Sequence, residues 1–558
     1  MKTLIIIAKK NWPVPLSMAC AAFFVYYPIT DADIFWHLAA GREMIARHAI
    51  LHSDPFAFTL ASPPWTDLHW LFQLLMYGLY KVGSYQALIA FKLVTVASVV
   101  ALLCLTVRSR KAILSAALLS ALLFYNIRYL LCIRPILISL LCMAIYLFLF
   151  EHARESGRKK PLWLCLPLQI IWTNSQGLYM IGLFIIGAYW VESIIRRLRD
   201  PDERPLTESA VLVLAAASCL FNPYGLAGLL LPFNLFSRIA PDVKNIYSLA
   251  ISENVPLLSL TGYDAVYRVA VFATAIMAGA LLFYNRKRAR IAPLILFTGF
   301  LSLAFFAVRN VPLYVVAVIP IIAGNIDLAG LMGQPRRPRL FTRPMCLISG
   351  SLATVVLLFL IFRYASIAAL YPPHQTISPF RFPEKIVGYL EEHPVPGAMF
   401  NDIRYGGYLI WRLYPQKQVF IDTRLIIRSP GFFADYLALS KHPDLFDRVA
   451  EKFDITQAIL PSALFTLHRQ LLRYLYESPR WHLEYTDGAS VLFVRNDIVG
   501  RTRLDLSRES TAGAIADSIS SQWYDAPAVR LEALGHFAEL LDNLGLHEVA
   551  EKIKRQGR

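Results

Sequence analysis

Two carboxylates stand in the stretch TDADIFWHLAAGREM, residues 30–44, directly after the first strongly apolar segment of the chain. His37 follows Asp33 by four residues, so both lie on the same side of a helix that begins near them. A carboxylate at a membrane boundary can deprotonate a hydroxyl acceptor, orient a sugar or bind a divalent cation. The simpler interpretation is capping, with Thr30, Asp31 or Asp33 as the N-cap of that helix. The spacing does not choose between these roles.

Arginine is the second residue type with chemistry near the same side of the membrane. Arg128 and Arg134 flank the turn NIRYLLCIRP, and Arg309 ends an apolar segment in VRNVP. A guanidinium binds phosphate through a planar pair of N–H donors. These three residues and Arg42 are therefore candidate phosphate-binding residues. The alternative for each of them is that the side chain snorkels to lipid phosphates.

His37 and five further polar residues are candidates to line a cavity next to the acidic pair. Asn174 lies in WTNSQG, Asn222 in FNPYG and Glu253 in SEN, all in apolar surroundings. For these three, hydrogen bonding at a helix end is the simpler role. Asp67 and His69, in WTDLHW, face the outer loop and could complete a site with the acidic pair.

The composition of the chain indicates the class of protein in which these residues lie. The chain of 558 residues is 56% hydrophobic and 17% charged, which is typical of a polytopic membrane protein. The net charge of +16 comes mostly from Lys and Arg clusters between apolar segments, so it does not indicate a nucleic-acid partner. The seven cysteines form no CxxC pair, and neither a disulfide framework nor a zinc site is indicated.

Apolar segments of near-spanning length recur along the first two thirds of the chain. We expect eleven membrane spans, near residues 12–30, 84–107, 112–130, 135–150, 161–175, 178–195, 207–222, 264–284, 291–308, 311–330 and 345–365. The pair around WTNSQG is the weakest, because one hairpin or re-entrant segment could replace two spans.

Basic residues in the connections predict the orientation of these spans. One set of connections carries 22 Lys and Arg residues and the opposite set carries 7. The first set is Lys2, Lys9, Lys10, Arg108, Arg110, Lys111, Arg154, Arg158, Lys159, Lys160, Arg196, Arg197, Arg199, Arg204, Arg286, Lys287, Arg288, Arg290, Arg336, Arg337, Arg339 and Arg343. The second set is Arg42, Arg47, Arg128, Arg134, Arg238, Lys244 and Arg309. We therefore expect a cytoplasmic N-terminus and, with an odd number of spans, a C-terminus outside.

The first outer loop, residues 31–83, contains two amphipathic patterns, FWHLAAGREMIARH and LHWLFQLLMYGLYKV. They predict helices that lie at the outer interface, with Trp36, Trp65 and Trp70 at headgroup depth. Together with this loop, residues 1–370 are expected to form the transmembrane domain.

From about residue 371 the pattern becomes that of a soluble protein. Runs AMFND, QVFIDT, QAILP and SVLFVRN predict strands, and PEKIVGYLEEH, YGGYLIWRLYP and PSALFTLHRQLLRYLYESP predict helices. Their alternation indicates a small α/β domain over residues 371–499, followed by a helical tail over 500–558 with two amphipathic helices. Asp402, Asp422 and Arg424 follow strand-like runs, where sites of α/β domains usually lie, although a structural role is the simpler interpretation.

The arrangement of these motifs resembles the C-type (GT-C) integral-membrane glycosyltransferases, which include protein O-mannosyltransferases and lipid A aminoarabinose transferases. More closely, it resembles a bacterial group of GT-C-like membrane proteins over nearly the whole chain to about residue 495. The matching pieces are Asp31 to Gly41, Asp54 to Thr59, Arg134-Pro135, Trp172 to Gly177, Phe221 to Gly225, Arg309 to Pro312, and Gly406 to Arg424. The chain departs from the pattern at Phe35, where Trp is usual, and at Gln176, where His is usual.

The resemblance implies an α-helical polytopic membrane protein with a C-terminal periplasmic α/β domain, in a bacterial inner membrane. It implies a glycosyltransferase that takes its sugar from a polyprenyl-phosphate donor and gives it to a glycan, lipid or protein hydroxyl. Asp33 or Asp31 would be the base, and the arginines would hold the donor phosphate.

Two other functions stay open on the same architecture. A transporter or assembly scaffold for lipid-linked glycans is expected to show charged residues near mid-membrane and related halves. A glycan polymerase or ligase that uses lipid diphosphates would share the outer arginines. The polar residues gather at the outer ends of the predicted spans, which favours chemistry at that surface.

Overall fold

The computed structural model describes residues 12–59, 64–200, 204–239, 246–247, 251–288, 290–331, 354–355, 357–366, 375–462, 466–524 and 526–556. The chain divides into two compact units. The helical unit comprises Met1–Tyr27, Thr66–Gln73 and Val82–Ala365, and the α/β unit comprises Pro28–Trp65, Leu74–Lys81 and Ser366–Arg558. The first outer loop therefore belongs largely to the same unit as the C-terminal region.

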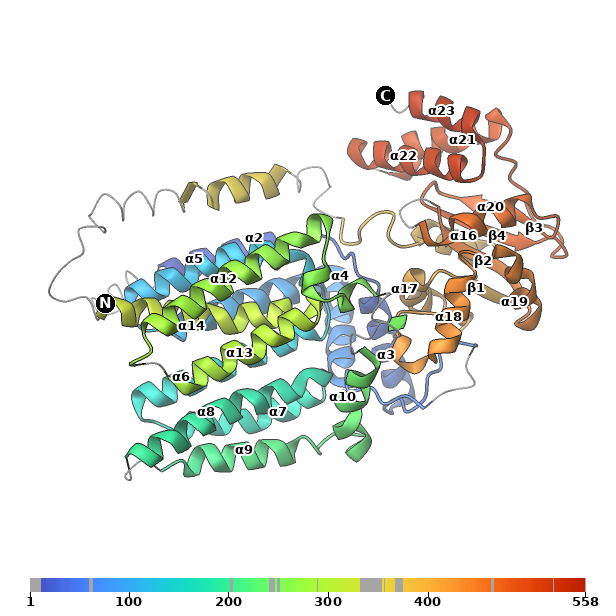
Figure 1. Cartoon of the computed structure of the whole chain (residues 1–558). Helices are drawn as coiled ribbons and strands as arrows, with labels where there is room; N and C mark the ends of the chain where they lie inside the picture. Colours follow the sequence, from blue (N-terminus) through green and yellow to red (C-terminus); the bar gives the residue numbers. More distant parts are fainter. Residues whose placement is uncertain are drawn as a thin grey trace. The chain divides into compact units, whose positions relative to one another are not determined.

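The helical unit is built from long apolar helices (Figure 1). They are α2 (Pro13–Phe24), α4 (Trp70–Leu105), α5 (Arg110–Ile127), α6 (Ile136–Ser156), α7 (Cys165–Thr173), α8 (Met180–Arg199), α9 (Leu206–Ser218), α10 (Gly225–Ile239), α12 (Ala265–Tyr284), α13 (Ile291–Phe306) and α14 (Val311–Leu331). Within the described residues, six helices are long and apolar enough to cross a membrane, and several shorter apolar helices accompany them. The chain is a multi-pass membrane protein.

Helices lie in each of the eleven segments expected to span, as far as these segments are described. The count of eleven spans stays a prediction, because only six helices meet the length and hydropathy of a span. Part of the last predicted span, residues 345–353, lies outside the described residues. The same holds for basic residues used to orient the chain, namely Lys2, Lys9, Lys10, Lys244, Arg336, Arg337, Arg339 and Arg343.

Helix α14 forms the centre of the helical unit. It packs against α5, α6, α12 and α13, and 78% of its apolar window is buried, against 28% for the window that contains α12. An all-round apolar helix is stable in such a central position, since every face meets another helix.

Helix α4 combines two segments that the sequence analysis predicts as separate elements, an interfacial helix and a membrane span. Its backbone leaves helical geometry at Gly83 and Ser84, where Ser84 has a φ of 51°. The break divides the amphipathic half, predicted as interfacial, from the apolar half, predicted as a span from residue 84. A left-handed conformation at a non-glycine residue ends one regular helix before the next begins.

The α/β unit has a four-stranded sheet in the order β1-β2-β4-β3. The strands are β1 (Ala398–Asn401), β2 (Ile455–Pro461), β3 (Trp481–Thr486) and β4 (Ser490–Arg495). Strand β2 pairs parallel with β1 and antiparallel with β4, and β3 pairs antiparallel with β4. The helices of the unit are α3 (Asp33–Arg47), α16 (Glu384–Glu392), α17 (Ile403–Leu413), α18 (Pro430–Ala438), α19 (Phe446–Lys452) and α20 (Arg469–Glu477). The predicted small sheet in the C-terminal region is confirmed.

Strand β3 is an element that the sequence analysis did not predict, although its sequence WHLEYT alternates apolar and polar residues. Its Glu484 is buried and accepts hydrogen bonds from the Tyr389 hydroxyl at 3.0 Å and from Arg501 at 3.2 Å. Partners from distant segments thus make a buried carboxylate tolerable there.

Residues 418–423, predicted as a strand, form isolated bridges instead. Val419 bridges Met399 of β1 on one side and Ala57 of the first outer loop on the other. The Asn401 side chain completes the first contact, since its amide donates to Ile421 O and accepts from Phe420 N. The outer loop therefore extends the edge of the sheet, with Val419 N donating to Phe56 O at 3.0 Å.

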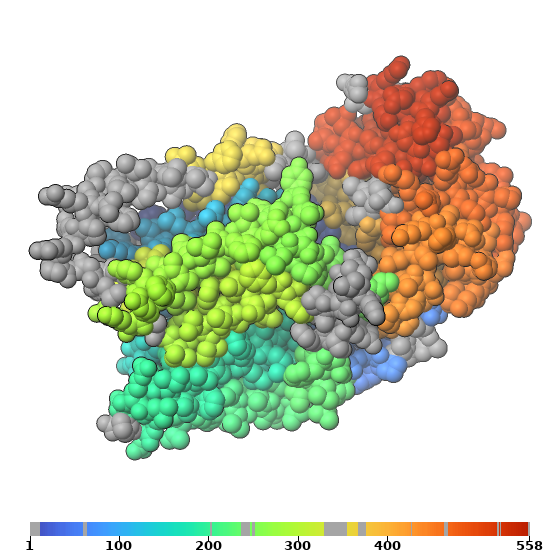
Figure 2. All heavy atoms as spheres, viewed as in Figure 1, coloured from blue at the N-terminus to red at the C-terminus, as the bar shows by residue number. Residues whose placement is uncertain are grey.

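The tail contains three helices rather than the two expected. They are α21 (Glu509–Ser518), α22 (Pro527–Asn543) and α23 (His547–Gln556). Helix α22 packs against α20, and the tail atoms (red) lie against the sheet region (orange) in Figure 2.

Candidate functional site

The two aspartates of the first motif lie in different surroundings. Asp33 is the first residue of α3, and its Oδ1 accepts a hydrogen bond from Trp36 Nε1 at 3.3 Å and a short one from the Thr423 hydroxyl. Asp31 accepts from the backbone N–H of Asp33 at 3.4 Å, close to a capping role. The N-cap itself is Ala32, without a side-chain cap. Capping is therefore not the role of the Asp33 carboxylate.

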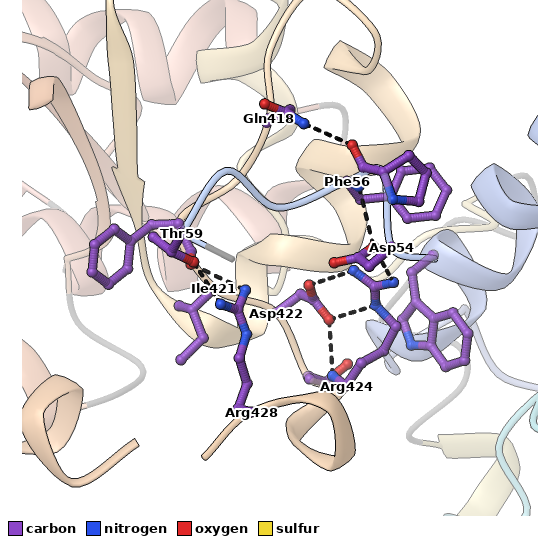
Figure 3. A network of polar contacts seen from close by, with 12 residues as sticks. Asp54, Phe56, Thr59, Gln418, Ile421, Asp422, Arg424 and Arg428 are labelled. Atoms are coloured by element: carbon purple, nitrogen blue, oxygen red, sulfur yellow. Dashed lines mark hydrogen bonds and ion pairs between the residues drawn. The ribbon is translucent and has the colours of Figure 1, made fainter. Parts of the chain in front are cut away.

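Thr423 comes from the motif IDTR, where both neighbours are part of a buried ion cluster (Figure 3). Arg424 donates from Nε and Nη2 to the two oxygens of Asp422, at 2.8 and 2.7 Å, and from Nη1 to Asp54 Oδ1 at 2.7 Å. Asp54 belongs to the first outer loop, so Arg424 joins that loop to the C-terminal region. The three charged side chains are almost fully buried.

Aromatic rings complete the surroundings of this guanidinium. The Arg424 Cζ lies 4.8 Å from the centre of the Trp65 ring, 5.1 Å from Phe56 and 5.7 Å from Trp36. Ring faces attract a cation. Trp36 and Trp65, expected at headgroup depth, are therefore buried inside the α/β unit. Burial alone would raise the pKa of Asp422, but Arg424 outweighs this and holds the pKa of that carboxyl below its usual value.

A second Asp-x-Arg pair repeats this geometry at the end of β1. Arg404 donates from Nε and Nη2 to the two oxygens of Asp402, each at 2.9 Å. His468 Nε2 lies 3.5 Å from Asp402 and 2.9 Å from the Tyr436 hydroxyl. Burial lowers the pKa of His468 to about 4, although Asp402 acts in the opposite direction. These contacts hold Asp402 in a buried ion pair at the end of β1, and the simpler, structural interpretation of this residue stays a prediction.

Arg42 and His37 lie on the same helix as Asp33. Arg42 donates to the carbonyls of Trp411 and Tyr414, each at 3.0 Å, and so joins α3 to the end of α17. His37 is buried, with its ring 3.6 Å from that of Trp36. The role of Arg42 in phosphate binding stays a prediction. The role of His37 in lining a cavity also stays a prediction.

In the helical unit, Asp67 and His69 form a close pair. Asp67 Oδ1 lies 2.6 Å from His69 Nδ1, and Gln176 Oε1 lies 3.0 Å from His69 Nε2. Gly177 N donates to the same Gln176 oxygen at 2.8 Å, which fixes the orientation of the amide. Both ring nitrogens of His69 therefore lie within hydrogen-bond distance of a side-chain oxygen.

Asn174 and Asn222 satisfy backbone groups at helix ends. Asn174 accepts from Trp70 Nε1 at 2.8 Å and donates to the carbonyls of Ile170 and Phe221. Asn222 donates to Cys219 O and accepts from Tyr224 N. These bonds agree with the simpler of the two roles considered for them.

The outer cations of the helical unit fall into two groups. Arg134 donates to both oxygens of Glu253, at 2.5 and 2.6 Å, and both residues lie within electrostatic reach of Arg309. This cluster keeps one net positive charge. Arg128 lies 4.1 and 4.3 Å from the rings of Tyr125 and Tyr129.

Lys92 is a charged residue that the sequence reasoning missed. It lies in α4 and is buried, with its Nζ 3.6 Å from the centre of the Tyr27 ring. The Tyr27 hydroxyl donates to Arg128 O at 3.0 Å, so Lys92 and Arg128 share a tyrosine-rich neighbourhood. The signal was present as a lone lysine in the apolar run LIAFKLVTV, since ionisable residues inside a span are usually functional.

Asp31, Asp33, His37 and Arg42 all lie in the α/β unit, on α3 or directly before it. Asp67, His69, Arg128, Arg134, Asn174, Asn222, Glu253 and Arg309 lie in the helical unit. Among the described residues, no group of three His, Cys, Asp or Glu side chains is arranged around a metal position.

Comparison with known proteins gives matches in structure alone. No protein-family model matches this sequence, and no curated protein matches it. The chain is similar to the Archaeoglobus fulgidus oligosaccharyltransferase in its apo form, with a TM-score of 0.51 and 12% identity over 92% of this chain and 78% of that one. The complex of that enzyme with zinc and sulfate gives 0.52 and 12% over 98% and 83%.

The chain has the fold of the GT-C membrane glycosyltransferases. The mycobacterial arabinofuranosyltransferase AftD also matches, with a TM-score of 0.48 and 13% identity over 86% of this chain and 40% of that one. The predicted resemblance to the GT-C fold is confirmed. At 12% identity the likeness extends to the fold, while the site must be argued from this chain's own residues.

Proposed function

We propose that this protein is a membrane glycosyltransferase that takes a sugar from a polyprenyl-phosphate donor and transfers it to a hydroxyl acceptor. It acts at the periplasmic face of a bacterial inner membrane, with about eleven spans, a cytoplasmic N-terminus and residues 371–499 as a periplasmic domain. The GT-C fold, the apolar helices and the distribution of basic residues support this assignment.

The observation that carries the proposal is the environment of Asp33. A general base must be ionised and held within hydrogen-bond reach of the proton that it takes. Asp33 Oδ1 accepts hydrogen bonds from Trp36 Nε1 and from the Thr423 hydroxyl, so α3 and a distant turn both hold this carboxylate. Asp31 instead accepts a hydrogen bond from the backbone N–H of Asp33 at 3.4 Å. We therefore assign the base to Asp33 rather than Asp31.

The reaction is a single displacement with inversion. The acceptor O–H gives its proton to Asp33 while its oxygen forms a bond to the anomeric carbon. The bond from that carbon to the phosphate oxygen breaks, and polyprenyl phosphate leaves as an anion. The leaving group is a weak base, so outer cations suffice to stabilise its charge.

The cation clusters of the helical unit are the candidates for that role. Arg128, with Lys92 nearby, has aromatic neighbours, and Arg309 shares Glu253 with Arg134. Because Glu253 offsets one charge of the second cluster, we expect Arg128 and Arg309 to contribute more than Arg134.

The test begins with the identity of the product. Mass spectrometry of envelope glycans and lipids after gene deletion identifies the missing sugar, and the purified chain is then assayed with that sugar on polyprenyl phosphate. We expect Asp33→Asn to lower transfer by about 100- to 10,000-fold, the usual contribution of a general base. Asp435→Asn, an exposed aspartate in α18, is the matched control and should retain activity.

Transfer activity is compared only among variants that reach the membrane in the same amount as the wild type. Asp31→Asn should lower transfer less than Asp33→Asn does. Wild-type transfer by the Asp31→Asn, Asp33→Asn double variant would remove the mechanism.

A further inference from the structure

Asp33 and Thr423 are 390 residues apart in the sequence and in direct contact in the structure. The Thr423 hydroxyl donates to Asp33 Oδ1, the same oxygen that accepts from Trp36 Nε1 at 3.3 Å. Two donors on one oxygen hinder rotation of the carboxylate, so the carboxylate is held in a defined orientation.

The position of Thr423 is set by its two neighbours. Asp422 and Arg424 are both buried, and the Arg424 backbone N–H donates to Asp422 Oδ1 at 2.9 Å, closing a tight turn around Thr423. Arg424 also holds Asp54 of the first outer loop at 2.7 Å. Figure 3 shows this guanidinium between the two carboxylates. The threonine therefore sits on a turn that cannot shift without breaking a buried ion cluster.

The glycine pair of α17 packs against both partners of the contact. A Cβ added at Gly407 would lie 2.4 Å from Ala32 O, next to Asp33. A Cβ added at Gly406 would lie 2.3 Å from Ile421 O, two residues before Thr423. Two neighbouring residues of α17 thus contact both backbone segments, which limits how far the hydroxyl and the carboxylate can move apart.

From this arrangement we propose that Thr423 is a positioning residue, which orients the Asp33 carboxylate for proton transfer. This inference rests on the proposed role of Asp33 as the base. It makes the C-terminal region a working part of the catalytic arrangement, because the hydroxyl comes from the IDTR turn. Thr423 itself need not touch the substrate.

Two variants of the full-length chain separate the hydroxyl from the shape of the side chain. Thr423→Val keeps the branched shape and removes the hydroxyl, and Thr423→Ser keeps the hydroxyl. Thr511→Val, at a half-buried threonine in α21, is the matched control. Each variant is compared with the wild type in detergent at equal concentration.

The first measurement needs no substrate. A water-soluble carbodiimide with an amine labels carboxyl groups, and peptide mass spectrometry gives the labelling rate of Asp33. Loss of a hydrogen bond to the carboxylate should raise that rate about tenfold in Thr423→Val and leave it unchanged in Thr423→Ser. The exposed Asp435 in the same sample is the internal standard.

The second measurement is a transfer assay with the polyprenyl-phosphate sugar that the mass spectrometry of envelope glycans and lipids identifies. In Thr423→Val we expect kcat to fall about tenfold while KM for the donor stays within about twofold, because the change affects the transition state alone. Thr423→Ser should restore kcat.

The outcomes decide between the two proposals. Wild-type labelling and kcat in Thr423→Val, or equal losses in the Ser and Val variants, would overturn the positioning role while the role of Asp33 stands. Increased labelling of Asp33 in Thr423→Val, combined with full activity of Asp33→Asn, would instead overturn the proposed function and leave the contact intact.

Discussion

At the level of single residues, the cluster of Asp54, Asp422 and Arg424 has the largest consequence for stability. One guanidinium binds two buried carboxylates, Asp422 at two residues and Asp54 at 370 residues from Arg424 in the sequence. The attraction between such charges offsets the cost of removing them from water only while every partner is present. Removing the arginine would leave two buried carboxylates without their cation.

We therefore expect Arg424→Met to destabilise the α/β unit by about 3 kcal/mol or more. The measurement is urea-dependent proteolysis of membranes that contain each variant. Arg473→Met removes a solvent-exposed partner of Glu477 and should change stability by no more than about 0.5 kcal/mol. Equal stability of the two variants would mean that the buried cluster contributes little.

At the level of elements, the contact between α3 and α17 places the acidic motif. Helix α17 carries Gly406 and Gly407 on the face that meets Ile421 and Ala32, and neither position has room for a methyl group. Arg42 joins the other end of α3 to the carbonyls of Trp411 and Tyr414. Close helix approach through glycine explains why YGGY, which is no dinucleotide fingerprint, is present in this segment.

Substitution of Gly407 tests this contact. In Gly407→Ala the new methyl would push Ala32 away and displace Asp33, so we expect transfer to fall about tenfold or more. Gly388→Ala, in α16, places its methyl in open space and should stabilise the chain by about 0.5–1 kcal/mol. Transfer rates from the identified donor are compared at equal amounts of folded protein. Wild-type rates in Gly407→Ala would show that the helix contact does not position the base.

At the level of the whole molecule, the chain combines a bundle of apolar helices with an α/β unit that includes its first outer loop. Segments 28–65 and 366–558 form one compact unit although the bundle lies between them in sequence. If both parts are outside the membrane, as the basic residues predict, the α/β unit assembles only after the last span has been inserted.

Reporter fusions test this orientation. Alkaline phosphatase fused after residue 556 should be active, and a fluorescent protein that folds only in the cytoplasm should be dark there. The same fluorescent protein inserted in the loop at Gly157 should be bright, because this loop carries a cluster of basic residues. The reverse pattern would place Asp33 on the cytoplasmic side and contradict the periplasmic assignment.

Much of the fold could be predicted from local patterns. Hydropathy located the helices of the membrane region, and the alternation of strands and helices predicted the small sheet, because both signals depend on near neighbours in the chain. Strand β3 was not predicted although its sequence WHLEYT carries the alternating pattern, and only the structure shows that Glu484 on it is buried with partners from distant segments. Residues 418–423 were wrongly predicted as a strand because their pairing is divided between β1 and the outer loop.

The candidate site also has features that the sequence predicts and features that it does not. The sequence by itself determined that the Asp31 and Asp33 pair lies at the start of a helix after an apolar segment, and that arginines lie at the ends of other apolar segments. Only the tertiary structure decided that Asp33 meets Thr423, that Arg424 binds both Asp54 and Asp422, and that Arg42 meets the end of α17. Hydropathy and periodicity depend on residues that are close together in the sequence. The pairing of side chains hundreds of residues apart depends instead on which surfaces pack together.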